Sequence, residues 1–510
     1  MKKCLFFAVP AFVLLLAACN NGNNGGGTPS RDFWAVDNVK GTYYSLTADC
    51  LAENDYCMVY ADQKAKVDSG VAENIASVYA SRIHGPITGT FGGIMDVDGN
   101  NKVIFLLLDI LDGSTGSGGY IGGYFYSLDM VKKGEDPNTQ EYYSNEADML
   151  YIDTNPGLQY MSGLFSTMAH ELQHLINYSN TAAINGGREP DVWINEGLST
   201  AAEFIYGRNS SRPDEIYPSG SSITGDPNGR LTVYSDPQNQ GYNKNIRCGN
   251  NFYIWSNGFW EKNETYGDLG NYATVYLFFQ WLRAHAANGT GIYKEIINSG
   301  YRDYRAVSVP VKNRFGEKIS LPGNGATEAD WDRVLQSWFL ANLLKQGGGG
   351  LYGYNGCLDY SLLATPFIRP GDYPELGDNS YELAPGEGIY SQLAASGDDK
   401  HDFTNGGSNI QYIGIENDGD WVLVGENDTD VTARYLLTYN KNTSQNPDAY
   451  EVGDIKRLAS AGIMANRLFN EGGGFASWGY LPGNYPVDRD VMARLREGKK
   501  PAGRLSKHAP

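Results

Sequence analysis

The segment His170-Glu171-Leu172-Gln173-His174 combines the residue types best suited to chemistry in this sequence. Apolar residues recur at helical spacing on both sides of it, which places His170 and His174 on one helix face, about 6 Å apart. Two imidazoles in this arrangement can bind one metal ion. Glu171 projects from the edge of the same face, where it can act as a general base without being a ligand. The alternative is a surface helix whose histidines bind nothing, although only six histidines occur in 510 residues.

A second helical segment, Trp193-Ile-Asn-Glu196-Gly-Leu-Ser-Thr-Ala-Ala-Glu203, offers a third ligand. Catalytic zinc takes three protein ligands and leaves one position for water. HExxH followed by W-x-N-E-G-x-S, with 21 residues between His174 and Glu196, resembles the gluzincin zinc metallopeptidases. The resemblance implies a zinc site formed by His170, His174 and Glu196, with Glu171 as the catalytic base. Glu196 as an ordinary solvated carboxylate is the alternative.

The same resemblance raises the question of which residue orients the histidines. Some gluzincins carry an aspartate at the position of Thr200, where it holds a ligand histidine. A hydroxyl is a weaker partner for that purpose, so Glu203, which lies seven residues after Glu196 on the same helix face, is an alternative.

A later helical segment, from Asn271 to Leu282, resembles the region in which related peptidases place a tyrosine that donates to the oxyanion of the reaction. The match falls on Tyr272, which we expect to be catalytic. Tyr276 is close enough in sequence to compete for the role, and either tyrosine could simply be packed in the core. His285 and His84 are weaker alternatives.

Over about residues 90–345, the chain looks most like the hyicolysin-type secreted zinc peptidases. That resemblance predicts a strand at the edge of the cleft, before the zinc helix, which binds substrate backbone; we place it at Met149–Asp153. Aminopeptidases of this clan carry a G-x-M-E-N motif for the substrate amine. Gly93-Ile-Met-Asp-Val97 departs from it at the last two positions, which favours an endopeptidase acting on proteins or peptides.

The elements that must position these residues indicate an α+β fold: a zincin-like catalytic domain with a mixed β-sheet and active-site helices, followed by a small C-terminal β-domain. The continuous apolar run Val103–Asp109 predicts a buried central strand. Helical periodicity covers residues 161–180, 192–206, 272–287 and 328–345. Alternating segments at 410–415, 421–424 and 435–439 predict strands of the β-domain.

The N-terminus predicts export. Lys2 and Lys3 precede an apolar run, and Leu16-Ala-Ala-Cys19 resembles a bacterial lipobox, which implies cleavage before Cys19 and lipidation of that residue. An ordinary secretory signal is the alternative. We expect a lipid-anchored protein of the bacterial cell envelope, at the outer membrane or cell surface, with these parts: a signal peptide (1–18), a flexible tether (19–30), the metallopeptidase domain (31–345), the β-domain (371–450) and a C-terminal extension (451–510).

The remaining cysteines predict disulfides. Cys50, Cys57, Cys248 and Cys357 are an even set in an oxidising compartment, and proximity in sequence favours the pairs Cys50–Cys57 and Cys248–Cys357, with buried thiols as the alternative.

A net charge of −19 argues against nucleic acid as a partner. Asp96-Val-Asp-Gly-Asn-Asn101 resembles the start of a calcium loop. Leu107 stands at the twelfth position, where such a loop has a glutamate, so a glycine-containing turn that enters the Val103 strand is the favoured interpretation.

Two readings of the function other than a zinc metalloendopeptidase stay open. One is a surface adhesin or ligand-binding lipoprotein whose peptidase domain is residual, in which case the β-domain would be the functional part. The other is a zinc hydrolase that acts on non-peptide amides. The presence of Glu171 argues against the first of these, because a lost activity leaves no pressure to keep the base.

Overall fold

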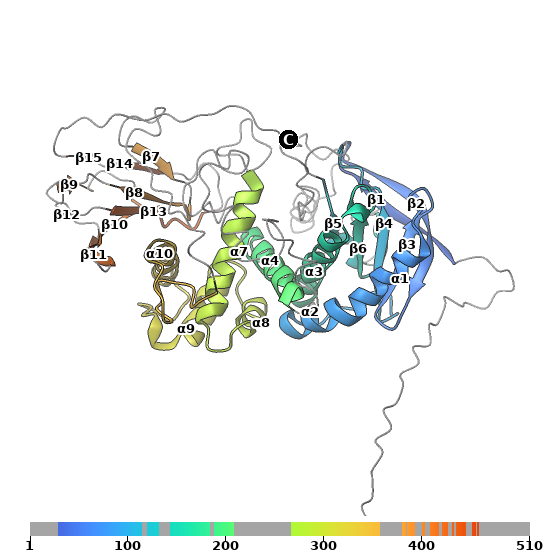
Figure 1. Ribbon diagram of the computed structural model, residues 1–510, viewed down its shortest axis with the longest axis horizontal. Coiled ribbons are helices and arrows are strands. Elements are labelled where there is room, and N and C mark those ends of the chain that lie inside the picture. Colours follow the sequence, from blue (N-terminus) through green and yellow to red (C-terminus); the bar gives the residue numbers. More distant parts are fainter. Residues whose placement is uncertain are drawn as a thin grey trace, which may run out of the picture.

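The computed structural model describes residues 29–114, 120–131, 143–183, 188–208 and 267–357, together with short stretches between 380 and 457. The predicted signal peptide, Cys19, most of the predicted tether, Cys248 and most of the predicted C-terminal extension lie outside the described residues. Figure 1 shows the arrangement of the rest: a sheet at one end, strands of a smaller sheet at the other, and helices between them.

The larger sheet has six strands in the order β1-β2-β3-β4-β6-β5. Strands β3, β4 and β6 run parallel to one another, and the β1–β2, β2–β3 and β5–β6 pairs are antiparallel, so the sheet is mixed. The strands are β1 (Ser30–Asp37), β2 (Thr42–Glu53), β3 (Cys57–Asp62), β4 (Val103–Leu108), β5 (Gly123–Phe125) and β6 (Met149–Asp153).

The central position predicted for the apolar run after Lys102 is confirmed, because β4 lies between β3 and β6 and all six of its residues are buried. Alternate side chains belong to two different cores: Phe105 packs among the helices, and Leu106 packs into the core on the opposite face. A strand covered on both faces needs apolar residues at every position, which explains the unbroken run.

The edge position predicted for Met149–Asp153 is wrong. This segment is strand β6, and it pairs with β4 on one side and with β5 on the other. The three-residue strand β5 forms the edge of the described sheet instead. A strand this short leaves little periodicity in the sequence. Gly123 lets it lie close to its neighbours, since a Cβ there would come within 2.7 Å of the Tyr151 carbonyl oxygen and 2.9 Å of Thr167 Cγ2.

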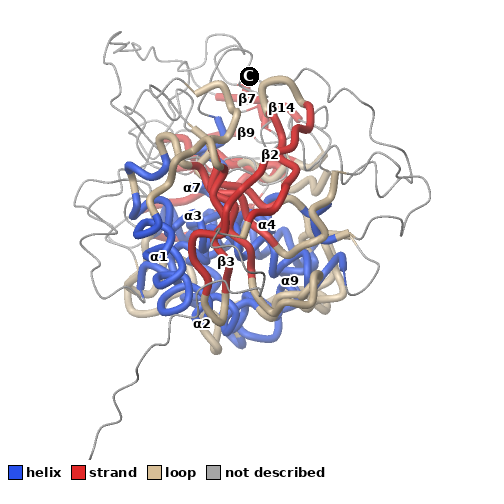
Figure 2. Tube along the Cα trace, turned by 90° about the vertical axis from the view of Figure 1, so that its right-hand side faces the viewer, coloured by secondary structure: helices blue, strands red, loops and turns tan. Residues whose placement is uncertain are grey.

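Helices cover one face of this sheet, and Figure 2 shows α1 alongside β3. The α-helices are α1 (Ser69–Val78), α2 (His84–Phe91), α3 (Met161–Tyr178), α4 (Val192–Arg208), α7 (Gly267–His285), α8 (Gly291–Ile297), α9 (Arg305–Arg314) and α10 (Glu328–Leu344). π-helical turns follow α1 at Tyr79–Ile83 and α3 at Ser179–Ala183, and 3-10 turns occur at Ser127–Met130, Gly157–Gln159 and Gly316–Lys318. In the part of the chain that the structure describes, none of the helices has both the length and the apolar character needed to span a membrane.

The four predicted helices are all present, with shifted ends. Helix α7 starts at Gly267, five residues before the predicted start at Tyr272. Helix α10 begins with a capping box between Thr327 and Asp330, and its last residue, Leu344, is followed by Lys345 in the left-handed conformation (φ 52°). The helix therefore ends within one residue of the predicted boundary at 345.

Helices α3, α4 and α7 form the layers that carry the predicted site. Helix α3 is buried on all sides from Leu164 to Tyr178, because the sheet covers one face and α4 covers another. Helix α4 in turn packs on α7. Their close approach depends on Gly197, where a Cβ would overlap the ring of Phe279.

The C-terminal strands form small antiparallel sheets, of which the largest has the order β11-β10-β13-β8. It packs against α10: the Tyr390 hydroxyl donates to the Phe339 carbonyl oxygen, and the Tyr439 hydroxyl donates to Asp332 Oδ1 at 2.6 Å. The strands are β7 (Ser380–Leu383), β8 (Gly388–Gln392), β9 (Lys400–Asp402), β10 (Ile410–Asn417), β11 (Trp421–Glu426), β12 (Val431–Thr432), β13 (Tyr435–Asn440), β14 (Glu451–Asp454) and β15 (Lys456–Arg457).

The predicted disulfide between Cys50 and Cys57 is wrong, and both residues carry buried thiols. Their side chains belong to the cores on opposite faces of the sheet, so closeness in sequence does not bring the sulfur atoms together. Burial raises the pKa of Cys57 to about 12, as expected for a thiol in an apolar core. Cys357 is also a thiol, and its predicted partner Cys248 lies outside the described residues.

The packing at Gly197 gives a stability prediction. Gly197→Ala lowers the free energy of unfolding by about 1–3 kcal/mol, because the added methyl group overlaps Phe279 and pushes α4 away from α7. Gly163→Ala is the matched control, since nothing lies within 4 Å of its added Cβ in helix α3; it raises stability by up to about 1 kcal/mol. Urea unfolding measures both. Equal stability of the two variants would contradict the contact.

Candidate metal centre

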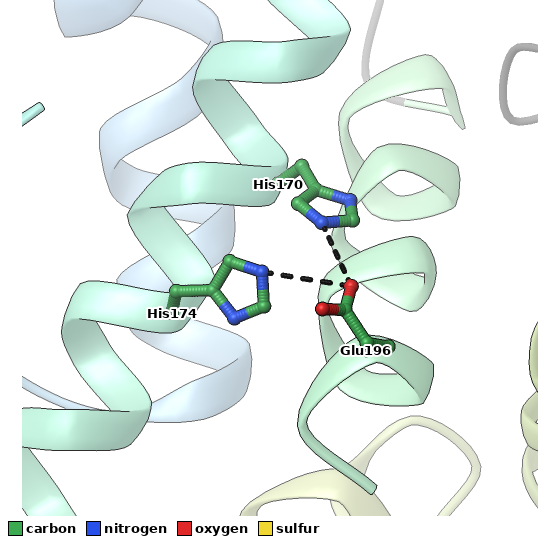
Figure 3. Close-up of side chains that lie close together, drawn as sticks. All are labelled: His170, His174 and Glu196. Carbon is green, nitrogen blue, oxygen red and sulfur yellow. Dashed lines mark ion pairs between the residues drawn. The ribbon is translucent and has the colours of Figure 1, made fainter. Parts of the chain in front are cut away.

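The structure brings the three predicted ligands together between two helices. His170 and His174 project from the same face of α3, and Glu196 faces them from the first turns of α4 (Figure 3). Glu196 Oε2 lies 3.3 Å from His170 Nε2 and 3.7 Å from His174 Nε2. All three side chains are at most 1% exposed. One nitrogen of each ring and one carboxylate oxygen therefore converge on a single buried point.

These distances fit a tetrahedral metal site. With metal–ligand distances of about 2.1 Å, two donor atoms of a tetrahedral zinc lie about 3.4 Å apart. The donor atoms of His170, His174 and Glu196 all lie within 4.8 Å of one another, which leaves room for one ion at their centre. Two imidazoles and one carboxylate are also a donor set that zinc accepts at catalytic sites.

Nδ1 of His170, the ring nitrogen that faces away from Glu196, is held by Glu203: it lies 2.8 Å from Oε1 of that carboxylate. Thr200 does not orient His170, because its hydroxyl donates to the Gly197 carbonyl oxygen at 3.0 Å. The structure thus answers the question left by the sequence in favour of Glu203. A carboxylate at Nδ1 keeps the proton on that nitrogen and leaves Nε2 as the donor toward a metal.

Nδ1 of His174, the ring nitrogen that faces away from Glu196, meets two residues to which the sequence analysis gave no role, although both belong to the W-x-N-E-G-x-S motif. His174 Nδ1 lies 3.1 Å from Asn195 Oδ1 and 3.0 Å from Ser199 Oγ. Asn195 comes directly before Glu196, and Ser199 lies one helical turn later on α4. The available signal was their spacing of four residues, which places both on one face of the helix.

The two histidines have opposite pKa shifts. Burial by itself lowers the pKa of an imidazole, but hydrogen bonds to Glu196 and Glu203 and the charge of Glu171 raise the pKa of His170 to about 10. Burial lowers the pKa of His174 to about 4, although the charge of Glu196 opposes this. In the protein alone, the carboxylates therefore favour a positive charge at the centre of the site.

Glu171, the predicted base, is completely buried beside the ligands and is connected to the edge strand. Its Oε2 atom accepts the backbone N–H of Phe125, in β5, at 3.0 Å. This contact fixes the carboxylate at the point where the edge of the sheet meets helix α3. The sequence did not point out Phe125, because a backbone donor leaves no mark on residue type.

Tyr272 lies next to the site, with its ring centroid 6.2 Å from that of His170. His285 is placed elsewhere: its Nε2 atom lies 2.7 Å from the Gly353 carbonyl oxygen, between α7 and the segment after α10. His84 lies between the rings of Tyr56 and Tyr79, at centroid distances of 4.7 and 5.6 Å. Of these three candidates, Tyr272 is the one that the structure places beside a predicted ligand.

The calcium-like segment forms the turn that leads into β4. Asp96 Oδ1 accepts the N–H groups of Gly99 and Asn100 at 2.8 and 3.1 Å. Asp98 and Asp148 also have a carboxylate oxygen near it, within 4.8 Å of one another. The hydrogen bonds are those of a turn.

With this geometry, the chain can be compared with known proteins. It is 29% identical over 307 residues to a neutral metalloprotease, ShpI, from Staphylococcus hyicus. The alignment covers 58% of this chain and 59% of that protein, so the chain matches less than two thirds of its relative's length. No protein-family model matches. The similarity and the buried His-His-Glu cluster together support a metal-dependent peptidase.

The assignment of Glu203 gives a prediction on metal binding. Glu203→Gln weakens zinc binding about 10-fold to 100-fold, because the charge that orients His170 is lost. Thr200→Val changes it less than about threefold, since the Thr200 hydroxyl contacts only backbone in the described structure. Competition with a fluorescent chelator measures both affinities. A larger effect at Thr200 than at Glu203 would reverse the assignment.

Proposed function

We propose that this protein is a zinc metalloendopeptidase, anchored by lipid at Cys19 to the bacterial cell envelope. The observation that carries the proposal is the convergence of His170, His174 and Glu196 on one buried point, with Glu171 fixed beside it. The similarity to a protein named as a neutral metalloprotease supports the same reaction class. A zinc ion bound there supplies Lewis acidity and lowers the pKa of a bound water toward neutrality.

Glu171 has the geometry of a general base. The Phe125 N–H holds one of its carboxylate oxygens, which fixes the plane of the group relative to α3. In the proposed reaction, Glu171 takes a proton from the attacking water and later delivers it to the leaving amine. Tyr272 donates a hydrogen bond to the developing oxyanion, a role suited to its place beside His170.

Substrate binding is proposed at the edge strand β5. An edge strand offers unpaired backbone groups that can add an extended peptide as a further strand. Because the Phe125 N–H of β5 contacts Glu171, a peptide bound along β5 would lie next to the proposed base. The departure of Gly93–Val97 from the amine-binding motif of aminopeptidases supports cleavage within a chain. We propose proteins or peptides as substrates, and neither nucleic acid nor a membrane contact apart from the lipid.

The first test removes the base. Glu171→Gln lowers the rate of cleavage of an unfolded protein substrate by about 10² or more, because proton transfer is lost. Its zinc content, measured by elemental analysis, stays equal to that of the wild type, since Glu171 is not a ligand. Equal cleavage by the two forms would exclude the mechanism. A wild type that holds no stoichiometric zinc would exclude the enzyme and favour a ligand-binding lipoprotein.

The second test concerns the oxyanion. Tyr272→Phe lowers kcat by about 10² or more, because the donor to the oxyanion is removed while the ring stays in place. Tyr276→Phe, one turn further along α7 and completely buried, is the matched control and changes kcat less than about threefold. Steady-state kinetics on a quenched fluorescent peptide measure both. An unchanged rate for Tyr272→Phe would move the role to another residue.

A further inference from the structure

The two metal-facing histidines are held by different kinds of group. His170 Nδ1 contacts the carboxylate of Glu203, which can only accept a proton in its ionised form. His174 Nδ1 instead contacts the amide oxygen of Asn195 and the hydroxyl of Ser199. A hydroxyl can either donate or accept, so by itself it does not decide which nitrogen of His174 carries the proton. A metal ligand needs that proton on Nδ1 and a lone pair on Nε2.

We propose that Ser199, with its hydroxyl proton directed by Gln173, is a positioning residue that keeps the Nδ1–H form of His174 and so presents Nε2 to the metal. This inference rests on the proposed zinc site and names residues that act on it through His174. Gln173 is one of the two residues between the glutamate and the second histidine of the HExxH motif. Its side chain leaves α3 next to His174 and meets Ser199 of α4.

The direction of the hydroxyl proton follows from the neighbours of Ser199. Its Oγ atom donates to Gln173 Oε1 at 2.5 Å and lies 3.1 Å from the backbone carbonyl oxygen of Asn195. Both neighbours are carbonyl oxygens, which accept and cannot donate. The single hydroxyl proton of Ser199 is therefore directed to one of them, and the oxygen is left to accept the Nδ1 proton of His174 at 3.0 Å.

A second contact also favours the proton on Nδ1 of His174. The Asn177 side-chain amide donates to Asn195 Oδ1, which fixes that oxygen as the atom facing His174 Nδ1. A carbonyl oxygen also accepts only, so Asn195 and Ser199 both select the same form of the ring. Gln173, Ser199 and Asn177 are completely buried, so water does not compete for these contacts.

The zinc affinity of the purified protein tests the inference. Ser199→Ala weakens zinc binding about 10-fold to 100-fold in chelator competition, because one of the two acceptors that hold His174 is lost. Thr200→Val is the matched control, since it removes the neighbouring buried hydroxyl of the same helix without touching a histidine; its affinity stays within about threefold of the wild type. Equal affinities for the wild type, Ser199→Ala and Thr200→Val overturn the inference.

Gln173→Met gives an independent route, should Ser199→Ala fail to fold. It leaves Ser199 in place but removes the nearer of the two oxygens that accept its proton, so that only the Asn195 carbonyl oxygen still holds the hydroxyl. We expect zinc binding to weaken about 10-fold. Wild-type affinity in Gln173→Met means that Gln173 does not direct the hydroxyl and overturns that part of the proposal.

Nitrogen NMR of the metal-free protein with labelled histidine separates this inference from the proposed function. The ring of His174, assigned from its loss in His174→Ala, shows Nδ1 protonated in the wild type. A ring protonated at Nε2 in the wild type overturns the inference. If the wild type binds no zinc, the proposed function fails, while the ring signal still decides which nitrogen these residues protonate.

Discussion

The structure around the site depends on the burial of three carboxylates next to two imidazoles. Glu171, Glu196 and Glu203 are completely buried, and removing a charged group from water costs several kcal/mol unless hydrogen bonds or an opposite charge offset it. In the protein, His170 supplies this opposite charge: the neighbouring glutamates raise its pKa to about 10, so its imidazole stays protonated at neutral pH. A divalent cation would meet the same requirement more fully, because its charge is larger and His170, His174 and Glu196 would all hold it.

The need to hold these charged groups at fixed distances explains why the helices around the site are so closely packed. The ligand atoms come from two helices, so their spacing is set by the distance between α3 and α4 and by the rotation of each helix about its axis. The sheet and the packing of α4 on α7 fix both, and Gly197 permits the short distance to Phe279. A shift of one ångström between the helices would change donor distances of 3.3 and 3.7 Å enough to disturb a metal site.

The sequence predicted contacts within a helix better than contacts between elements. The spacing of His170 and His174 and the central strand β4 follow from periodicity, and both are present. The edge strand β5 was missed because Gly123–Phe125 is too short to have a period. The Cys50–Cys57 pair failed because the face of each side chain depends on strand register, which includes an irregularity between Cys50 and Ala52. Ser199 and Gln173 were missed because their contact depends on how two helices are rotated against each other.

The arrangement favours an enzyme over a binding protein with a residual site, on energetic grounds. A binding protein gains nothing from Glu171 in the core, since an apolar side chain of similar size would avoid the cost of burying a carboxylate. Strained or costly groups persist where activity needs them, at the expense of stability. Glu171 is charged but is not a proposed metal ligand. A backbone N–H of β5 nevertheless holds it in place beside the proposed ligands. The cost of burying this carboxylate is explained if Glu171 moves a proton during catalysis.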